Sequence, residues 1–292
     1  MQARVRVTTM IAMAVMVAGC DRVVDITLPD GPVQLVVEGR VEAVHGSVSG
    51  HQEVLLSASA PYFSNQAAPP ARGARVMIAD GTGRNVVLQE STTQPGLYRT
   101  DDLVGVVGSA YTLRIHWQGD DYEAVDTLLA VPPIDSMYFA PRKNTGFDPG
   151  SGSGKPGPRA TIDTRDQAGV PNYYLWDMYV DGKRIVEVDS AEWARPIDSD
   201  QLYDGLPLLA FQSHPNVALS SGQMVRVRQQ SLTAQSYRYF RNLNDQLDGD
   251  GSPFSMPPNP VRGNVANKTR PDARALGYFI ATHVSERSMR VP

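Results

Sequence analysis

Short apolar runs separated by turn residues dominate residues 33–133. In several runs, β-branched or aromatic residues alternate with polar ones, which is the pattern of half-buried strands. Strands are predicted at 33–41, 54–58, 74–79, 85–88, 96–99, 111–117 and 122–129. Asp80 and Gly81 form a favoured hairpin turn between two of them. Such short strands, with turns about every 8–12 residues, predict a β-sandwich domain over residues 33–133, closed by Pro132 and Pro133.

Residues 134–292 are predicted to form a second β-rich domain. Strands are expected at 134–139, 160–163, 172–180 and 184–188, with a hairpin turn at Asp181 and Gly182. The sequence VRVR at 225–228 alternates strictly between valine and arginine. Because neighbouring side chains of a strand point to opposite faces, we expect one face of this strand to be exposed to water. The second domain is therefore predicted to be an antiparallel sheet or barrel.

One amphipathic helix is predicted at about 233–248. Its apolar positions recur at helical spacing, at Tyr237, Phe240, Leu243 and Leu247. Thr233 can cap the first turn, and Gly249 can end the helix in a left-handed conformation. We expect this helix to pack across the second sheet. The predicted fold is therefore mainly β, with a sandwich followed by an antiparallel β domain that carries one packed helix.

The first 19 residues have the layout of a secretory signal peptide. Arg4 and Arg6 precede a mostly apolar run at 8–17, and two small residues follow it. The apolar run is about a dozen residues long, whereas a transmembrane helix needs roughly 20. We therefore predict that residues 1–19 are a leader that is removed and that the remaining chain works outside the cytoplasm.

Cys20 is the only cysteine of the chain, and it directly follows this leader. The VAGC sequence at 17–20 resembles the bacterial lipobox, in which the cysteine sulfur receives a diacylglycerol before cleavage. We predict lipidation at Cys20 and attachment to a membrane through it. Several acyl chains on one residue make release negligible, since each buried methylene contributes about 0.8 kcal/mol. Residues 20–32 then form a tether, because the Asp-Gly-Pro turn at 30–32 discourages regular structure.

Composition narrows the classes of partner. The chain carries 27 Lys and Arg against 31 Asp and Glu, so its net charge is −4. Nucleic-acid-binding proteins present a basic face, so we expect no nucleic-acid partner. With Cys20 acylated, no thiol remains for a disulfide, and stability must come from the hydrophobic cores.

The candidate catalytic and metal-binding motifs do not match their patterns. The GSGSGK sequence at 150–155 lacks the first glycine and the final Ser or Thr of a phosphate loop. A calcium loop starting at Asp248 would need a glutamate at its twelfth position, where Asn259 stands. The acidic pairs at 101–102 and 120–121 lie at expected turns, and we interpret them as solvated. We therefore predict no catalytic residue, no metal ligand and no cofactor.

Aromatic residues are the remaining indication of a binding site. They concentrate in the predicted second domain, where such rings usually form the core. A minority of them can line concave ligand sites, in which aromatic rings recur. The candidate ligand-facing residues are Tyr173, Trp176, Trp193 and Tyr203.

An ordered set of short motifs carries a family resemblance. The set comprises LVVEG at 35–39, GARV at 73–76, GLY at 96–98, GSAYTL at 108–113, YEA at 122–124, VPPIDS at 131–136, YYLW at 173–176, GNVAN at 263–267 and LGYF at 276–279. Together they resemble the bacterial lipoprotein family catalogued as domain of unknown function 4249. The first half also resembles transthyretin-like modules, which implies an immunoglobulin-like sandwich. The resemblance implies an outer-membrane lipoprotein, often encoded near TonB-dependent receptors, and it implies no catalytic residues.

From these observations we expect a lipid-anchored protein of the cell envelope, in the outer membrane, with the periplasmic or surface face left open. The leading hypothesis is a non-enzymatic binding or accessory component of TonB-dependent nutrient uptake, with a TonB-dependent outer-membrane receptor as partner. One alternative is an envelope hydrolase with a site built from dispersed Asp, His and Ser residues. The other is a purely structural envelope protein.

Overall fold

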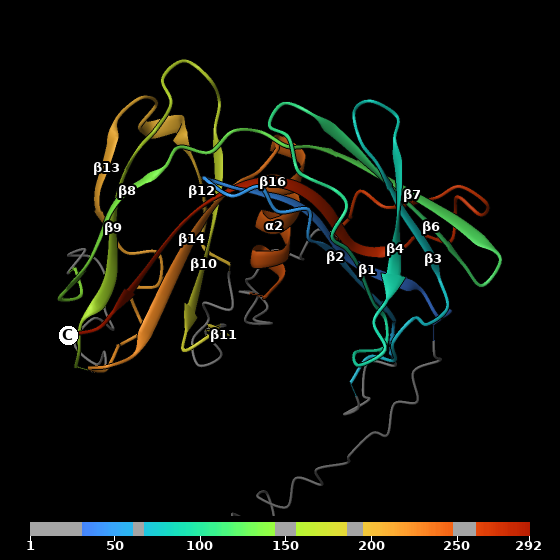
Figure 1. Ribbon diagram of the computed structural model, residues 1–292, viewed down its shortest axis with the longest axis horizontal. Coiled ribbons are helices and arrows are strands. Elements are labelled where there is room, and N and C mark those ends of the chain that lie inside the picture. The colour runs from blue at the N-terminus through green and yellow to red at the C-terminus, as the bar shows by residue number, and fades with distance from the viewer. Residues whose placement is uncertain (1–30, 61–66, 144–155, 186–194, 248–260) are drawn as a thin grey trace, which may run out of the picture. The chain divides into compact units, whose positions relative to one another are not determined.

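The computed structural model describes residues 31–60, 67–143, 156–185, 195–247 and 261–292 (Figure 1). Residues 33–292 form one compact unit. Three predicted features, the lipidation site Cys20, the aromatic Trp193 and the helix-ending Gly249, lie outside the described residues.

The chain is mainly β, which confirms the predicted fold class. The strands expected from the apolar runs are present, except that only the short β11 is found where a strand was expected at 184–188, and residues 186–188 lie outside the described part. The helical elements of the described residues are η2 (Asp200–Leu202) and α2 (Ala234–Leu247). No helix in this part of the chain is long and apolar enough to cross a membrane. The strands are β1 (Leu35–Val44), β2 (Gln52–Ala58), β3 (Arg75–Ala79), β4 (Asn85–Glu90), β5 (Leu97–Thr100), β6 (Ala110–Trp117), β7 (Asp120–Thr127), β8 (Ile134–Ala140), β9 (Arg159–Arg165), β10 (Tyr173–Val180), β11 (Lys183–Arg184), β12 (Ile197–Ser199), β13 (Pro207–Phe211), β14 (Met224–Ser231), β15 (Ala266–Asn267) and β16 (Leu276–Arg290).

The strands form one long sheet and one short sheet. The long sheet has the order β11-β10-β14-β16-β1-β2-β5-β4-β3-β6-β7-β15, with β12 paired to β10, and the short sheet has the order β13-β9-β8. The sandwich arises because the long sheet folds over, so that β3, β6 and β7 cover β1 and β2. β16 pairs with β1 in parallel, from Val36 opposite Leu276 to Val44 opposite Val284. The C-terminal strand therefore lies beside the first strand (Figure 1).

Alternation along β16 assigns its side chains to different cores. Phe279 and Ala281 point into the sandwich core, together with the inward residues of β1, β2 and β6. Tyr278 and Ile280 point to the opposite face, where they pack with Phe240 of α2. A further core lies between β10, β14 and the short sheet. A single strand thus contributes to packing on both faces of the long sheet.

The predicted boundary between residues 133 and 134 coincides with a change of core. The sandwich core takes most of its residues from 35–128, and the core beside the short sheet takes its residues from 131–291. The sandwich core nevertheless includes Val265, Ala275, Phe279 and Ala281 from the C-terminal part. The division into two domains remains a prediction, while the contacts join residues 33–292 in one compact unit.

Helix α2 is fixed to the sheet at its first turn. The Ser236 amide donates to Thr233 Oγ1 at 3.2 Å, which confirms Thr233 as the cap. The Thr233 hydroxyl in turn donates to Asp126 of β7 at 2.8 Å, and the Ala281 amide of β16 donates to the other oxygen of that carboxylate at 3.1 Å. Burial raises the pKa of Asp126 to about 6. One buried carboxyl group therefore connects β7, β16 and the start of the helix.

The interpretation of residues 120–121 as a solvated turn is wrong for Asp120. Its side chain is buried, and both carboxylate oxygens accept from Arg270, with Nε at 2.9 Å from Oδ1. This hydrogen bonding to Arg270 lowers the pKa of Asp120 to about 2. Asp121 remains exposed. Local sequence patterns contain no sign of this contact, because Arg270 lies 150 residues away along the chain.

Substitution of Gly277 tests the close approach of β16 to β1. Gly277 has φ of +82°, and a Cβ at this position would overlap the carbonyl oxygen of Val37. We expect Gly277→Ala to lower the free energy of unfolding by about 3 kcal/mol or more, because left-handed strain and a backbone overlap act together. The matched control is Gly222→Ala, with φ of +87° and no atom within 4 Å of the added Cβ. It should cost only about 1–2 kcal/mol. Equal losses in urea unfolding would contradict the close approach.

Candidate functional site

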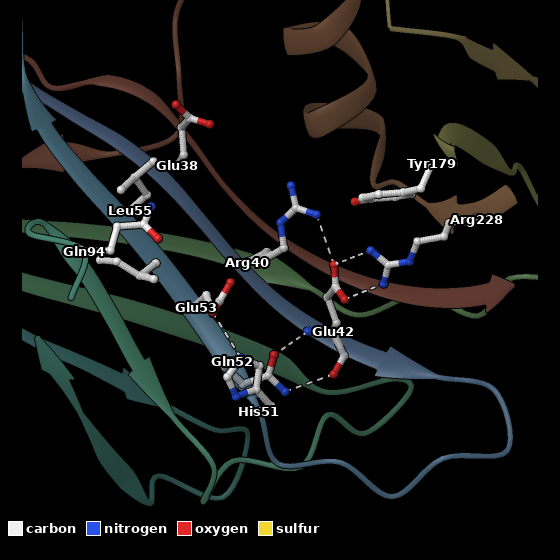
Figure 2. Close-up of a pocket in the computed structure, with 11 residues that line it drawn as sticks. Glu38, Arg40, Glu42, His51, Gln52, Glu53, Leu55, Gln94, Tyr179 and Arg228 are labelled. Carbon is white, nitrogen blue, oxygen red and sulfur yellow. Dashed lines mark hydrogen bonds and ion pairs between the residues drawn. The ribbon is translucent and has the colours of Figure 1, made fainter. Parts of the chain in front are cut away.

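The part of the sheet face beside α2 that the helix leaves uncovered carries the candidate site. Because side chains alternate along β1, Glu38, Arg40 and Glu42 all point to this face. Two hollows of about 380 and 300 Å³ open there, and both are lined by Glu38 and Arg40. We call the two hollows together the β1 groove. The larger hollow lies over β1 and β2 (Figure 2), and the smaller one lies between β1, β16 and α2.

In the larger hollow, Glu42 lies between two guanidinium groups (Figure 2). Arg228 Nη2 is 2.6 Å from Glu42 Oε2, and Arg40 Nη1 is 3.0 Å from Oε1. Arg228 also forms an ion pair with Glu286 of β16, at 3.1 Å from its Nε. Burial by itself favours a neutral Glu42, but the guanidinium groups of Arg228 and Arg40 bring the pKa of Glu42 below its ordinary value. The groove therefore contains a charged network that extends over β1, β14 and β16.

The prediction of a water-exposed arginine face on β14 is wrong for Arg228. Its side chain is only 9% exposed, because acidic groups from two neighbouring strands surround it. Arg226 is half-buried, with its guanidinium carbon 4.5 Å from the centre of the Tyr179 ring. The alternation identified the face correctly, but it could not show that Glu42 and Glu286 would cover one of its arginines.

His51 stands at the rim of the larger hollow. Its Nδ1 is 2.6 Å from Asp101 Oδ1, and its Nε2 is 3.1 Å from Glu53 Oε1. The hydrogen bond to Asp101 raises the pKa of His51. A Ser-His-Asp arrangement needs one imidazole nitrogen directed at a hydroxyl group, whereas both nitrogens of His51 face carboxylates. His51 is therefore a charge-bearing group of the rim and not a general base for a serine.

Arg195 and α2 form the wall of the smaller hollow. The Asn244 side chain bonds both the backbone amide and the carbonyl oxygen of Arg195, at 3.1 and 3.0 Å. The guanidinium carbon lies 5.1 Å from the centre of the Phe240 ring. Among the described residues, no carboxylate forms an ion pair with Arg195. Burial, followed by the nearby charge of Arg184, lowers the pKa of Arg195 to about 10, so the group remains charged at neutral pH.

Of the aromatic residues predicted to face a ligand, the three that the structure describes do not line the β1 groove. Trp176 is a core residue, 1% exposed, with its ring 4.6 Å from that of Phe211 and its Nε1 donating to Gln229. Tyr173 is half-buried against Tyr237, at 4.9 Å between ring centres, and Tyr203 is half-buried beside the short sheet. The aromatic residues that do line the groove are Tyr179, Tyr239, Phe240 and Tyr278. The YRYF sequence at 237–240 is the signal that could have identified two of them.

Three aspartates are the described residues that could hold a metal ion. Carboxylate oxygens of Asp166, Asp200 and Asp204 lie within 4.8 Å of one another. Each already accepts hydrogen bonds from the protein. Tyr174 and the Gly205 amide donate to Asp166, the Asn172 amide donates to Asp200, and the Gly169 amide donates to Asp204. These donors account for the positions of the carboxylates without a cation, and we assign no metal to them.

The fold and the groove define a mainly β protein with an open, charged and partly aromatic concavity. The chain belongs to the family described as domain of unknown function DUF4249, whose model matches residues 21–288. This match confirms the resemblance carried by the ordered motifs. A search of curated proteins finds no match to the chain. The family description names no activity, so the function has to be argued from the groove itself.

The ion pair between Glu42 and Arg228 should be essential to the fold around the groove. We expect Glu42→Gln to lower the free energy of unfolding by about 3 kcal/mol, because it removes the anion shared by Arg228 and Arg40 and leaves the buried guanidinium of Arg228 with Glu286 alone. In the double variant with Arg228→Met, part of this loss should be recovered, which a double-mutant cycle in urea measures. Glu123→Gln is the control, since its pair with Arg114 at 3.2 Å is largely exposed. It should cost less than about 1 kcal/mol. Equal losses for Glu42→Gln and Glu123→Gln would show that the buried pair is not special.

Proposed function

We propose that this chain is a non-enzymatic, lipid-anchored binding protein of the cell envelope that serves TonB-dependent uptake. The observation that carries the proposal is the β1 groove. Its two joined hollows combine fixed charges with aromatic and aliphatic walls, as ligand sites do. Its volumes of about 380 and 300 Å³ suit a small molecule. A purely structural envelope protein would have no need of such a surface.

The contacts of His51 and His214 favour binding over hydrolysis. His51 faces two carboxylates, as described above. Ser213 Oγ lies 2.9 Å from His214 Nδ1, but burial lowers the pKa of His214 to about 4. A general base works best when its pKa is near the operating pH, so this imidazole would be a poor base at neutral pH. Neither of these two histidines therefore offers a good general base to a serine, which supports a ligand site over a hydrolytic one at both positions.

Attachment to the envelope rests on the sequence. The leader at 1–19 and the lipobox-like sequence ending at Cys20 support secretion and lipidation. The family resemblance supports a TonB-dependent receptor as partner. A binding protein held at the membrane surface raises the local concentration of its ligand near such a receptor, because tethering makes the encounter effectively intramolecular.

Replacement of Cys20 tests the anchor and the partner. The Cys20→Ala variant should lose metabolic lipid labelling and accumulate with its leader attached, because the sulfur that receives the lipid is absent. A TonB-dependent receptor should be recovered with the wild-type protein from detergent-solubilised membranes and lost with the variant. Normal labelling of the variant would refute lipidation at Cys20. Recovery of no receptor with the wild type would refute the partnership.

Filling the groove tests ligand binding without knowledge of the ligand. The wild-type protein, purified under native conditions, should release a bound small molecule when it is denatured. The Glu38→Trp variant, prepared in the same way, should release none of this compound. Glu38 is exposed and lines both hollows, so an indole there should occupy the site without disturbing the core. Val87→Trp places the same ring on an exposed strand position outside the groove and should keep the compound. Mass spectrometry identifies the compounds in the extracts of the wild type, Glu38→Trp and Val87→Trp. The same compounds in all three extracts would contradict a ligand site in the groove.

A further inference from the structure

The smaller hollow of the β1 groove contains two opposite charges that do not pair. Arg195 and Glu38 both line it, and among the described residues neither forms an ion pair. Their neighbours behave differently. Arg40 and Arg228 bind Glu42, and Arg184 binds Asp177 at 2.5 Å. A hollow that keeps one cation and one anion apart, in a region where other charges are paired, is suited to a ligand that carries both charges.

Glu38 lies on a strand, whereas Arg195 lies just before β12 and is held by contacts with α2. Arg195 is fixed through its backbone to the Asn244 side chain of α2, and its guanidinium rests on the Phe240 ring. Glu38 lies on a strand that is paired on both sides, opposite Tyr278 of β16 and Leu55 of β2. Sites built on helices and strands hold their geometry better than sites on loops. The positions of the two charges are therefore properties of the fold.

The remaining walls of this hollow are apolar or aromatic. The aliphatic residues Val36, Leu243 and Ile280 line it together with the rings of Tyr239, Phe240 and Tyr278. The Tyr239 and Tyr278 rings pack with their centres 4.6 Å apart. The volume of about 300 Å³ lies at the lower end of small-molecule sites. The lining thus suits a compact ligand with one apolar side chain.

We propose that the smaller hollow binds a free α-amino acid with an aromatic or large aliphatic side chain, its carboxylate at Arg195 and its ammonium group at Glu38. The planar guanidinium matches a carboxylate with two parallel hydrogen bonds. The carboxylate of Glu38 accepts from an ammonium group. The side chain then contacts Tyr239 and Leu243. This inference names the ligand class of the groove and therefore rests on the proposed function.

Other ligand chemistries leave one of the two charges unmatched. A fatty acid, a phosphate or an aromatic carboxylate would neutralise Arg195 but would leave Glu38 without a cationic partner. An amine would have the opposite defect at Arg195. Arg195 is half-buried, so an amine that covers it without supplying a carboxylate binds weakly, because the lost hydration is not replaced. Glu38 is exposed, and a ligand without an ammonium group forgoes a charge-assisted hydrogen bond there. The pair of charges therefore selects a zwitterion over either singly charged analogue.

Calorimetry with three matched probes tests the proposal on the full-length lipidated protein in detergent at neutral pH. L-phenylalanine carries both charges, 3-phenylpropionate lacks the ammonium group, and 2-phenylethylamine lacks the carboxylate. We expect L-phenylalanine to bind at least about tenfold more tightly than either analogue, since each charge-assisted hydrogen bond contributes measurably. Equal affinity for L-phenylalanine and 3-phenylpropionate would overturn the assignment of Glu38. Equal affinity for L-phenylalanine and 2-phenylethylamine would overturn that of Arg195.

Two variants assign the charges separately. Glu38→Gln should weaken L-phenylalanine about tenfold and leave 3-phenylpropionate no weaker, because only the ammonium contact is lost. Arg195→Met should weaken both carboxylate probes to a similar extent. Its thermal stability should be unchanged or higher, since a half-buried cation without an ionic partner is replaced by an apolar side chain of similar length. A marked fall in stability would show that the guanidinium has a structural role, and would overturn the proposal.

Probe binding and the native extracts together distinguish failure of the amino-acid assignment from failure of the proposed binding function. If none of the three probes binds and the native extracts still contain a compound that depends on Glu38, the groove binds a ligand of another class and only the zwitterion assignment fails. If neither the probes nor the extracts show a ligand, both proposals fail. Binding of L-phenylalanine that Glu38→Gln leaves unchanged would place the amino acid elsewhere on the protein.

Discussion

The parallel pairing of β16 with β1 is the interaction on which the rest of the structure depends. It joins strands from the two ends of the described chain and makes one sheet continuous from β11 to β15. Through it, Phe279 completes the sandwich core on one face, and Tyr278 supports α2 on the other. The tight contact needs a glycine at 277, because any side chain there would meet the Val37 carbonyl group. Without this pairing the two halves would not share a face, and the β1 groove would not form.

The same pairing explains how charged residues come to be buried in the groove. Glu42 of β1, Arg228 of β14 and Glu286 of β16 belong to three successive strands of the sheet. Arg228 is the register partner of Glu286, and its guanidinium reaches diagonally across β16 to Glu42, which is opposite Thr282. Removing such charges from water costs several kcal/mol per ion, and mutual pairing offsets the cost. Arg195 is the exception, because it rests on an aromatic ring and is near the charge of Asp177, but forms no ion pair with a described carboxylate. The proposed amino-acid ligand would supply the missing anion.

Aromatic residues show why a binding surface is difficult to locate from residue types. Trp176 and Phe240 are both large, apolar and flanked by other rings in the sequence. Trp176 lies on the face of β10 that the short sheet covers, whereas Phe240 lies on the helix face that borders the open part of the long sheet. Residue type sets how strongly each ring prefers burial. Which ring borders an open surface depends on the sheet and helix that pack against it.

Local patterns determined much of this protein. Period-two alternation placed the strands, and helical spacing with Thr233 as cap placed α2, because both signals arise from neighbouring residues. The ordered motifs pointed to the family that the match confirms. The partners of Arg228, Asp120 and Arg195 were decided only by the tertiary structure. Each lies on an element distant in sequence, and contacts of that kind leave no local periodicity. The sequence therefore predicts which residues form strands and helix, whereas the packing of elements distant in sequence decides which charged side chains pair with one another.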